Sequence, residues 1–485
     1  MSRPNFLIVI PDQLRADAVG AFGSTVAKTP HLDAFAASAT RFSNAFTQHS
    51  VCSPSRVSFW TGLYPHTRGR RTLTDLIRPD EPNLLRYLKE DGYYVTHIGQ
   101  RGDTFAPGAT ELAVHDYGFI VQPTVATFGR MAGSPMATAI PRTFYVGLDT
   151  NAEAIDNDEA MTRSAIEWLG APPDQPWAMV LPLFAPHCPF VVAEPWYSLY
   201  DRAEMPERAA QPTGHEPAYM RLVRETWGLD AVTDAEWREI QAVYLGMVSR
   251  MDDQFGRILS ALDANGLRED TVVIFFTDHG EYLGDYGLVE KWPAGVHECL
   301  TRDPLLIGGP TLQRGREVPA LVEMVDLMPT VLELADITPR ETHFGRSLVP
   351  LLRGASDEHR EYAFTEGGFL VTEEVAFENP APPYDLKGKV QHDHPDAVGR
   401  CIAVRDHEWT YVWRMYEECE LYSRIADPRE EHNLAAAPEH AERIERMHRA
   451  MQDWLLHTSD VMSMNDVPRF PSIDLPTPGV RLAAG

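Results

Sequence analysis

Short runs of almost uniformly apolar residues, rich in β-branched and aromatic side chains, recur along the first two thirds of the chain, and segments with helical periodicity separate them. Strands that are covered on both faces have this composition, whereas half-exposed strands alternate apolar and polar residues. We therefore expect an α/β fold whose large, mainly parallel sheet is flanked by helices on both faces. The expected strands are residues 5–10, 94–98, 177–183, 271–276 and 304–307, and the expected helices are residues 30–39, 83–91, 243–264 and 325–335.

The sequence pattern changes after residue 352. A Gly-Ala-Ser stretch at 354–356 is typical of a joint between domains. Strand-like segments and a last helix-like segment follow it, at residues 362–365, 401–405, 410–413 and 438–456. We therefore expect a catalytic domain of residues 1–355 and a smaller α+β domain of residues 356–485 with an antiparallel sheet and a Pro-rich tail. Residues 105–157 are less periodic and rich in Gly, Pro and Thr, so we expect loops over the functional site there.

The chain is strongly acidic, with a net charge of -27 over its 485 residues. Such a field repels the phosphate backbone of nucleic acids and anionic lipid headgroups, so we expect neither partner. No apolar run approaches the ~20 residues of a membrane-spanning helix. The five cysteines are far apart and form no CxxC pair, which disfavours a disulfide framework and favours a reducing, cytoplasmic location. Because the net charge of the chain is negative, an anionic substrate would need a local group of cationic side chains.

Acidic and polar residues directly follow two of the expected strands. Asp12 and Gln13 come after the first strand, and Asp278 and His279 come after the strand at 271–276. The carboxyl ends of parallel strands meet at one edge of a sheet, where α/β proteins gather functional groups. Two carboxylates, an amide oxygen and an imidazole suit one divalent cation of intermediate hardness. Each pair alone is also typical of an ordinary turn, so the predicted metal site depends on the two pairs meeting.

Cys52 begins a Cys-Ser-Pro-Ser-Arg sequence that ends at Arg56 and precedes a Thr-Gly-x-x-Pro turn at residues 61–65. Most free cysteines are small buried residues, and a thiolate nucleophile would need a base, for which His49 is the near candidate in sequence. A third interpretation takes the whole pattern, which resembles the sulfatase family of the alkaline-phosphatase-like superfamily. In that family the cysteine of this motif is oxidised to formylglycine by a formylglycine-generating enzyme. The resemblance implies the same maturation of Cys52.

Further segments resemble the same family and occur in the same order. "FAPHCPF" at 184–190 carries His187 at the position of the family's leaving-group histidine, and "TDHGEYLGDYGLVEK" ends in Lys291. The resemblance implies that an oxygen of the hydrated aldehyde attacks the sulfur of a small anionic ester. It also implies that Arg56 and Lys291 bind the anion, and that His187 or Lys291 protonates the departing alcohol. The metal ligands that it implies are Asp12, Gln13, residue 52 in its matured form, Asp278 and His279.

Two departures from the family pattern bear on the metal and on the substrate. Asp-Gln and Asp-His at the strand ends resemble the subset that contains choline sulfatases and phosphonate monoester hydrolases, and the nitrogen ligand makes Mn2+ more plausible beside Ca2+. Where the family has a Gly-Lys-Trp-His element, Gln100 and Gly102 stand in place of its lysine and histidine. The candidate substrate-binding residues at this element are therefore Gln100, Arg101 and Thr104, and His297, near Trp292, is a further candidate.

The sequence thus predicts a metal-dependent hydrolase of aryl or alkyl sulfate esters. Hydrolysis of phosphonate monoesters or phosphodiesters on the same residues is the alternative, because these substrates also carry one negative charge. A catalytically silent binding protein and a cysteine-dependent hydrolase are the alternatives from other classes. The oligomeric state is left open, a homo-oligomer included.

Overall fold

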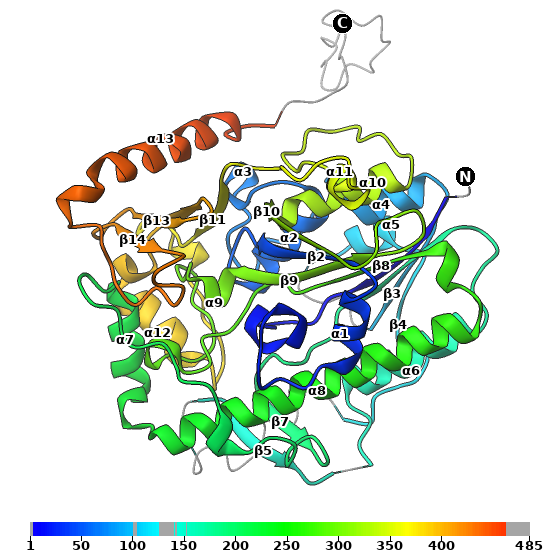
Figure 1. Ribbon diagram of the computed structural model, residues 1–485, viewed down its shortest axis with the longest axis horizontal. Helices are drawn as coiled ribbons and strands as arrows, with labels where there is room; N and C mark the ends of the chain where they lie inside the picture. The colour runs from blue at the N-terminus through cyan, green and yellow to red at the C-terminus, as the bar shows by residue number, and fades with distance from the viewer. Residues whose placement is uncertain (1–2, 100–103, 126–139, 141–142, 152, 462–485) are drawn as a thin grey trace, which may run out of the picture.

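An eight-stranded sheet runs through the centre of the computed structural model, which describes residues 3–99, 104–125, 140, 143–151 and 153–461 (Figure 1). The strand order is β10-β2-β9-β8-β1-β6-β3-β4. Strand β9 runs antiparallel to both of its neighbours, and every other neighbouring pair is parallel. This sheet confirms the expected fold class. Its strands are β1 (Asn5–Val9), β2 (Thr40–Phe46), β3 (Tyr94–Ile98), β4 (Asp116–Gly118), β6 (Trp177–Leu181), β8 (Thr271–Phe276), β9 (Arg302–Gly308) and β10 (Arg316–Glu323).

The central strand β1 shows why the buried runs are apolar at every position. Phe6 and Ile8 pack into one apolar cluster, and Leu7 and Val9 pack into another on the opposite face of the sheet. Helices α1 (Pro30–Ala36), α6 (Asn157–Leu169) and α8 (Asp234–Ala264) cover the second cluster, and α2 (Cys52–Thr61), α4 (Leu84–Glu90) and α10 (Leu327–Leu334) cover the first (Figure 1). With helices on both faces, neither side of the strand tolerates polar residues.

Some boundaries differ from the expected ones for identifiable reasons. The long helix α8 begins at Asp234, nine residues before the expected residue 243, because Thr233 and Glu236 form a reciprocal capping box there. The segment at 105–157, expected to be loops, contains α5 (Ala109–Ala113), β4 and β5 (Tyr145–Asp149). Strand β4 extends the large sheet, and β5 pairs with β7 (Phe190–Ala193) in a separate two-stranded sheet.

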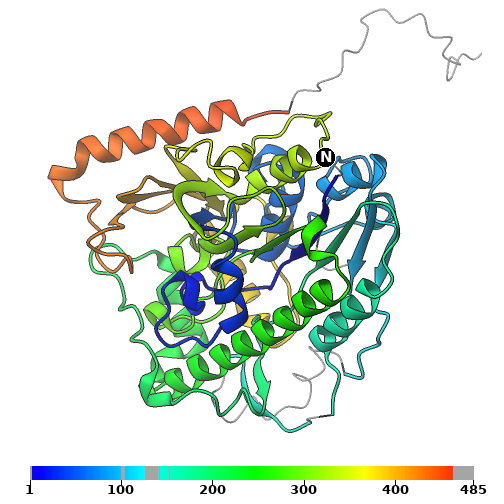
Figure 2. The ribbon, with the colours of Figure 1, turned by 45° about the vertical axis from the view of Figure 1, so that its right-hand side comes forward.

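The C-terminal part forms an antiparallel sheet in the order β11-β12-β13-β14, as expected. Its strands are β11 (Ala363–Gly367), β12 (Cys401–Arg405), β13 (Trp409–Arg414) and β14 (Glu420–Ser423). Helix α13 (Ala441–His457) lies along the outer side of this sheet (Figure 2). The largest apolar cluster nevertheless contains residues from both sides of the predicted boundary at 355, among them Phe369, Val390 and Val398. The Pro-rich tail lies outside the described residues.

The remaining helices are short or lie at the periphery: α3 (Pro65–Arg68), α7 (Ala218–Trp227), α9 (Glu298–Thr301), α11 (Val349–Leu352) and α12 (Asp385–Asp393). Helix α12 packs against α7. Within the part of the chain that the structure describes, no helix combines the length and the apolarity needed to cross a bilayer.

Candidate active site

The two polar pairs that follow β1 and β8 meet at one edge of the sheet, as these neighbouring parallel strands require. The backbone N–H of Gln13 donates to Asp278 Oδ1 at 3.2 Å. The Thr277 hydroxyl donates to the Pro11 carbonyl at 2.8 Å and accepts from the backbone N–H of Leu14 at 3.1 Å. These bonds join the two loops, so the carboxylates are held in fixed positions relative to one another.

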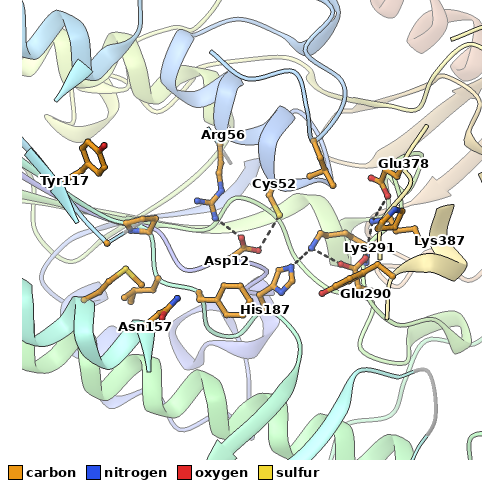
Figure 3. A pocket seen from close by; sticks show the side chains of 18 of the residues that line it. Asp12, Cys52, Arg56, Tyr117, Asn157, His187, Glu290, Lys291, Glu378 and Lys387 are labelled. Carbon is orange, nitrogen blue, oxygen red and sulfur yellow. Dashed lines mark hydrogen bonds and ion pairs between the residues drawn. The ribbon is translucent and has the colours of Figure 1, made fainter. Parts of the chain in front are cut away.

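Cys52 is the first residue of helix α2 and lies against these loops (Figure 3). Its Sγ is 3.1 Å from His279 Nε2 and 3.6 Å from Asp12 Oδ1. Ligand atoms of Asp12, Cys52, Asp278 and His279 all lie within 4.8 Å of one another, and all four residues are buried. The structure therefore brings together four of the five sequence-predicted metal ligands in one compact cluster.

Arg56, one turn further along α2, bridges the two carboxylates of this cluster. Its Nε donates to Asp278 Oδ2 at 2.8 Å and its Nη2 donates to Asp12 Oδ2 at 2.7 Å. Burial alone would raise the pKa of Asp278, but the positive charge of Arg56 holds it well below its usual value. The Asp278 carboxylate is thus ionised at neutral pH, as a metal ligand must be.

The donor set fits a divalent cation. The Nδ1–H of His279 donates to the Gly280 carbonyl at 2.8 Å, which leaves the Nε2 lone pair facing Asp12 and Cys52. Burial lowers the pKa of His279 to about 4, so the ring is neutral at pH 7 and can act as a ligand. Two carboxylates with one imidazole match Mn2+ at least as well as Ca2+.

Gln13, the fifth predicted ligand, uses both ends of its side-chain amide in hydrogen bonds to other side chains. Its Oε1 accepts from Lys291 Nζ at 2.7 Å, and its Nε2 donates to the Glu281 carboxylate. Its backbone has a φ of 67°, which turns the chain sharply after Asp12. The structure thus places the amide oxygen of Gln13 against a lysine.

Lys291 and His187 form the polar wall beside Cys52. Lys291 Nζ lies 2.8 Å from His187 Nε2 and 2.8 Å from Glu290 Oε1. The Nδ1–H of His187 donates to the Cys188 carbonyl, so its Nε2 accepts from Lys291. Burial, reinforced by the charge of Lys291, holds the pKa of His187 well below its usual value. The ionisable proton of this pair therefore lies on Lys291.

These groups line a pocket of about 840 Å³. One side of it is polar, with Asp12, Cys52, Arg56, His187 and Lys291 (Figure 3). The rest of the wall is largely apolar and includes Leu73, Tyr117, Phe119, Met161, Phe184 and Tyr384. Tyr117 and Phe119 belong to the segment that was expected to lie over the site.

The four predicted substrate-binding residues are not placed in the pocket wall by the described part of the structure. Gln100 and Arg101 lie outside the described residues. Thr104 is buried, and its carbonyl accepts from the backbone N–H of Ile77 at 2.9 Å. His297 is enclosed by tyrosine rings, with its Nδ1 3.3 Å from the hydroxyl of Tyr282. Neither Thr104 nor His297 is among the described residues that line the pocket, because each is taken up by contacts in the protein interior.

Three charged residues on the pocket wall were missed by the sequence analysis: Glu290, Glu378 and Lys387. Glu290 is adjacent to Lys291, so its proximity could have been inferred. Lys387 and Glu378 come from the C-terminal part of the chain, in a polar segment that looks like ordinary surface. Nothing local in the sequence distinguishes them.

The mainly parallel sheet with helices on both faces has the alkaline-phosphatase-like fold. A family model for sulfatases matches residues 4–337, which is more than half of the chain, and the chain therefore belongs to the sulfatase family. Sulfatases hydrolyse sulfuric esters, and this chain is a sulfuric ester hydrolase.

Individual relatives span nearly the whole chain. It is 28% identical over 480 residues to the uncharacterized sulfatase YidJ of Escherichia coli strain K12, which covers 94% of this chain and 88% of that one. It is 28% identical over 514 residues to the multifunctional alkaline phosphatase superfamily protein PehA of Trinickia caryophylli, covering 95% and 96%. The crystal structure of the phosphonate monoester hydrolase of Agrobacterium radiobacter shares the fold, with a TM-score of 0.76 at 24% identity over 96% of this chain and 100% of that one.

Proposed function

We propose that the protein hydrolyses sulfate esters of aryl or alkyl alcohols, with one bound Mn2+ or Ca2+ ion and with formylglycine formed from Cys52. The observation that carries the proposal is the position of Cys52. It begins α2 with the whole Cys-Ser-Pro-Ser-Arg sequence intact, and its Sγ contacts both Asp12 and His279 of the acidic cluster. A formylglycine-generating enzyme is the maturation partner that this proposal requires.

Asp12, Asp278, His279 and residue 52 would hold the metal ion. When bound, the metal would act as a Lewis acid on the ester, and the hydrated aldehyde of formylglycine would supply the nucleophilic oxygen. The tight spacing of the four ligand atoms, within 4.8 Å of one another, supports one ion and not two.

The chain's own residues supply the rest of the chemistry. The N-terminal end of α2 directs its positive dipole end toward the anion, and Arg56 bridges the carboxylates of Asp12 and Asp278 and favours the ionised form of Asp278. Lys291 holds its proton although burial opposes the charge, because the carboxylates of Glu290, 2.8 Å from Nζ, and of Asp12 raise its pKa above the usual value. We assign to Lys291 the donation of this proton to the departing alcohol oxygen, and to His187 the role of orienting the Lys291 ammonium group.

Hydrolysis of phosphonate monoesters or phosphodiesters is the second candidate. Its support is the similarity over almost the full length to PehA, whose name describes it as multifunctional, together with the Asp-Gln and Asp-His pairs. These substrates carry one negative charge, as sulfate esters do, so the same cationic wall would accept them.

The test is kcat/KM for an aryl sulfate and an aryl phosphonate monoester with the same leaving group. The protein is co-expressed with a formylglycine-generating enzyme and assayed with manganese and with calcium. A preference for the sulfate supports the proposal, and a preference for the phosphonate establishes the second candidate. Peptide mass analysis of residue 52 accompanies the assay, because an unmodified cysteine without bound metal would identify a silent binding protein.

A further inference from the structure

A second buried lysine lies behind Lys291. Lys387 on helix α12 is 3% exposed and lines the pocket (Figure 3). Its Nζ is 3.3 Å from Glu290 Oε2 and 3.7 Å from Glu378 Oε2. A lysine ammonium is rarely buried without a role, because removing it from water is costly unless carboxylates surround it.

Glu290 joins this lysine to the proposed proton donor. Its Oε1 is 2.8 Å from Lys291 Nζ, whereas its Oε2 accepts from the backbone N–H of Lys291 at 2.7 Å and faces Lys387. Burial alone would raise the pKa of Glu290, but Lys291, Lys387 and His187 hold it well below its usual value. Glu290 is therefore a fully buried anion that divides its two oxygens between two lysines.

We propose that Lys387 is a positioning residue for Lys291. By balancing the charge at Glu290 Oε2, Lys387 lets the Lys291 ammonium group remain bonded to His187 and directed at the substrate. The inference rests on the proposed function of Lys291 as the proton donor to the leaving group.

The electrostatics explain how this works. Without Lys387, the negative charge of Glu290 would be balanced chiefly by Lys291, and a buried carboxylate attracts its remaining partner strongly. Lys291 Nζ, already 2.8 Å from Glu290 Oε1, would then be drawn toward the uncompensated Oε2 as well, and its 2.8 Å contact with His187 Nε2 would lengthen. A donor displaced in this way delivers its proton late or not at all when the bond to the departing oxygen breaks.

Helix α12 also supplies a matched control. Lys389, two residues after Lys387, is exposed and forms an ion pair with Asp393 on the same helix. Substituting Lys387→Met and Lys389→Met therefore makes the same chemical change at one buried and one exposed position of one helix.

The experiment uses the matured, metal-loaded full-length enzyme and a series of aryl sulfates whose phenols have increasing pKa values. For Lys387→Met we expect kcat/KM to fall by about tenfold or more for the poorest leaving groups and to change less than about threefold for the best, because good leaving groups need little protonation. Lys389→Met should match the wild type throughout. An equal loss on all esters would overturn the proposal. Partial misfolding lowers every rate equally, so it cannot imitate the steeper dependence on the leaving group.

A double-mutant cycle with Glu290→Gln tests whether Lys387 acts through Glu290. In the Glu290→Gln background, Lys387→Met should add little to the loss, because the charge that it balances is already gone. Independent, multiplying effects of the two substitutions would overturn the route through Glu290.

Failure of the proposed function gives a different result. If the wild-type enzyme hydrolyses no sulfate ester, the same leaving groups are tested as phosphonate monoesters, and a steeper dependence in Lys387→Met there supports the role of Lys387 while the sulfate proposal falls. A wild-type enzyme that is inactive on both series overturns both proposals.

Discussion

At the scale of single residues, the surroundings of Cys52 favour a precursor over a thiolate nucleophile. The sequence-adjacent base candidate, His49, is fully buried, and its Nδ1 accepts from the backbone N–H of Val51. Burial lowers its pKa to about 3, so it remains neutral and gives no cationic partner to a thiolate. His279 Nε2, which lies 3.1 Å from Sγ, is a neutral nitrogen of the cluster formed by Asp12, Cys52, Asp278 and His279.

Replacing Cys52 with Ala tests this directly. We expect kcat/KM to fall by about a thousandfold or more, because the nucleophile is lost. The thermal unfolding midpoint should change little, since Ala is well tolerated at the first position of a helix. Activity assays and circular dichroism melts measure both quantities. Retention of most of the rate would rule out the formylglycine mechanism, and the matured wild-type enzyme should in addition resist thiol alkylation.

Asp278→Asn should lose bound metal and activity together. The substitution removes one of the two carboxylates of the cluster and with it the charge that accepts from Arg56 Nε. The lost anion weakens the attraction for a divalent cation in a buried site. Metal content per chain after gel filtration is the readout, beside kcat/KM at saturating manganese. A variant that keeps one metal ion per chain would show that Asp278 is not a ligand.

At the scale of elements, the C-terminal end of α2 depends on Gly62. This residue caps the helix with a φ of 69°, and a Cβ there would lie 2.9 Å from His343 Cβ. Gly69 caps α3 with a similar φ of 72°, but nothing lies within 4 Å of its Cβ position. Alanine substitutions at these two positions therefore separate the cost of backbone strain from the cost of steric crowding.

Gly69→Ala should cost about 1 kcal/mol of unfolding free energy, from the left-handed backbone alone. Gly62→Ala should cost about 2–3 kcal/mol, because overpacking is added to the same strain. Urea denaturation monitored by circular dichroism compares them. Equal losses would mean that the loop around His343 moves aside without cost.

The elements that the sequence predicts best are those with one environment along their whole length. Strands β3 and β8 are buried on both faces, and their boundaries match the expected ones. Strand β10 was not expected, because it lies at the edge of the sheet and contains Pro319, which a central strand excludes. Strand β2, which is paired on both sides, was not among the strands expected from composition either, because Arg41, Ser43 and Asn44 interrupt its apolar residues. Composition therefore predicts the strands that are apolar throughout and leaves out those that contain polar residues or proline.

The residues of the candidate active site likewise divide into those that the sequence could place and those that it could not. Asp12, Asp278 and Cys52 could be placed from the sequence because each follows a strand or begins a helix whose position the fold determines. Lys387 could not, because its neighbour Lys389 shares its local sequence yet lies at the surface. Only the packing of α12 over the pocket distinguishes the two lysines.

At the scale of the whole molecule, the two expected domains share apolar packing. In strand β12, Cys401 and Ala403 belong to the large cluster that also contains Val9 of the central sheet. Ile402 and Val404, on the other face of the strand, pack with residues of α13. The small sheet is thus covered on both faces, with the large part of the molecule on one side and α13 on the other. The pocket also takes Lys387 and Glu378 from the C-terminal part, so both parts complete one site.

This packing predicts that the molecule unfolds as one unit. Native-state hydrogen exchange at increasing denaturant should give β12 and β8 the same opening free energy, equal to that of global unfolding, because β12 cannot separate without exposing the core that it shares with β1. Exchange measured by mass spectrometry on peptides that cover 401–405 and 271–276 makes the comparison. The amides of α13, which covers only the outer face of the small sheet, should open at lower free energy and serve as the internal control. An opening of β12 several kcal/mol below that of β8 would instead show an independent C-terminal domain, and Lys387 would then leave the pocket whenever that domain opened.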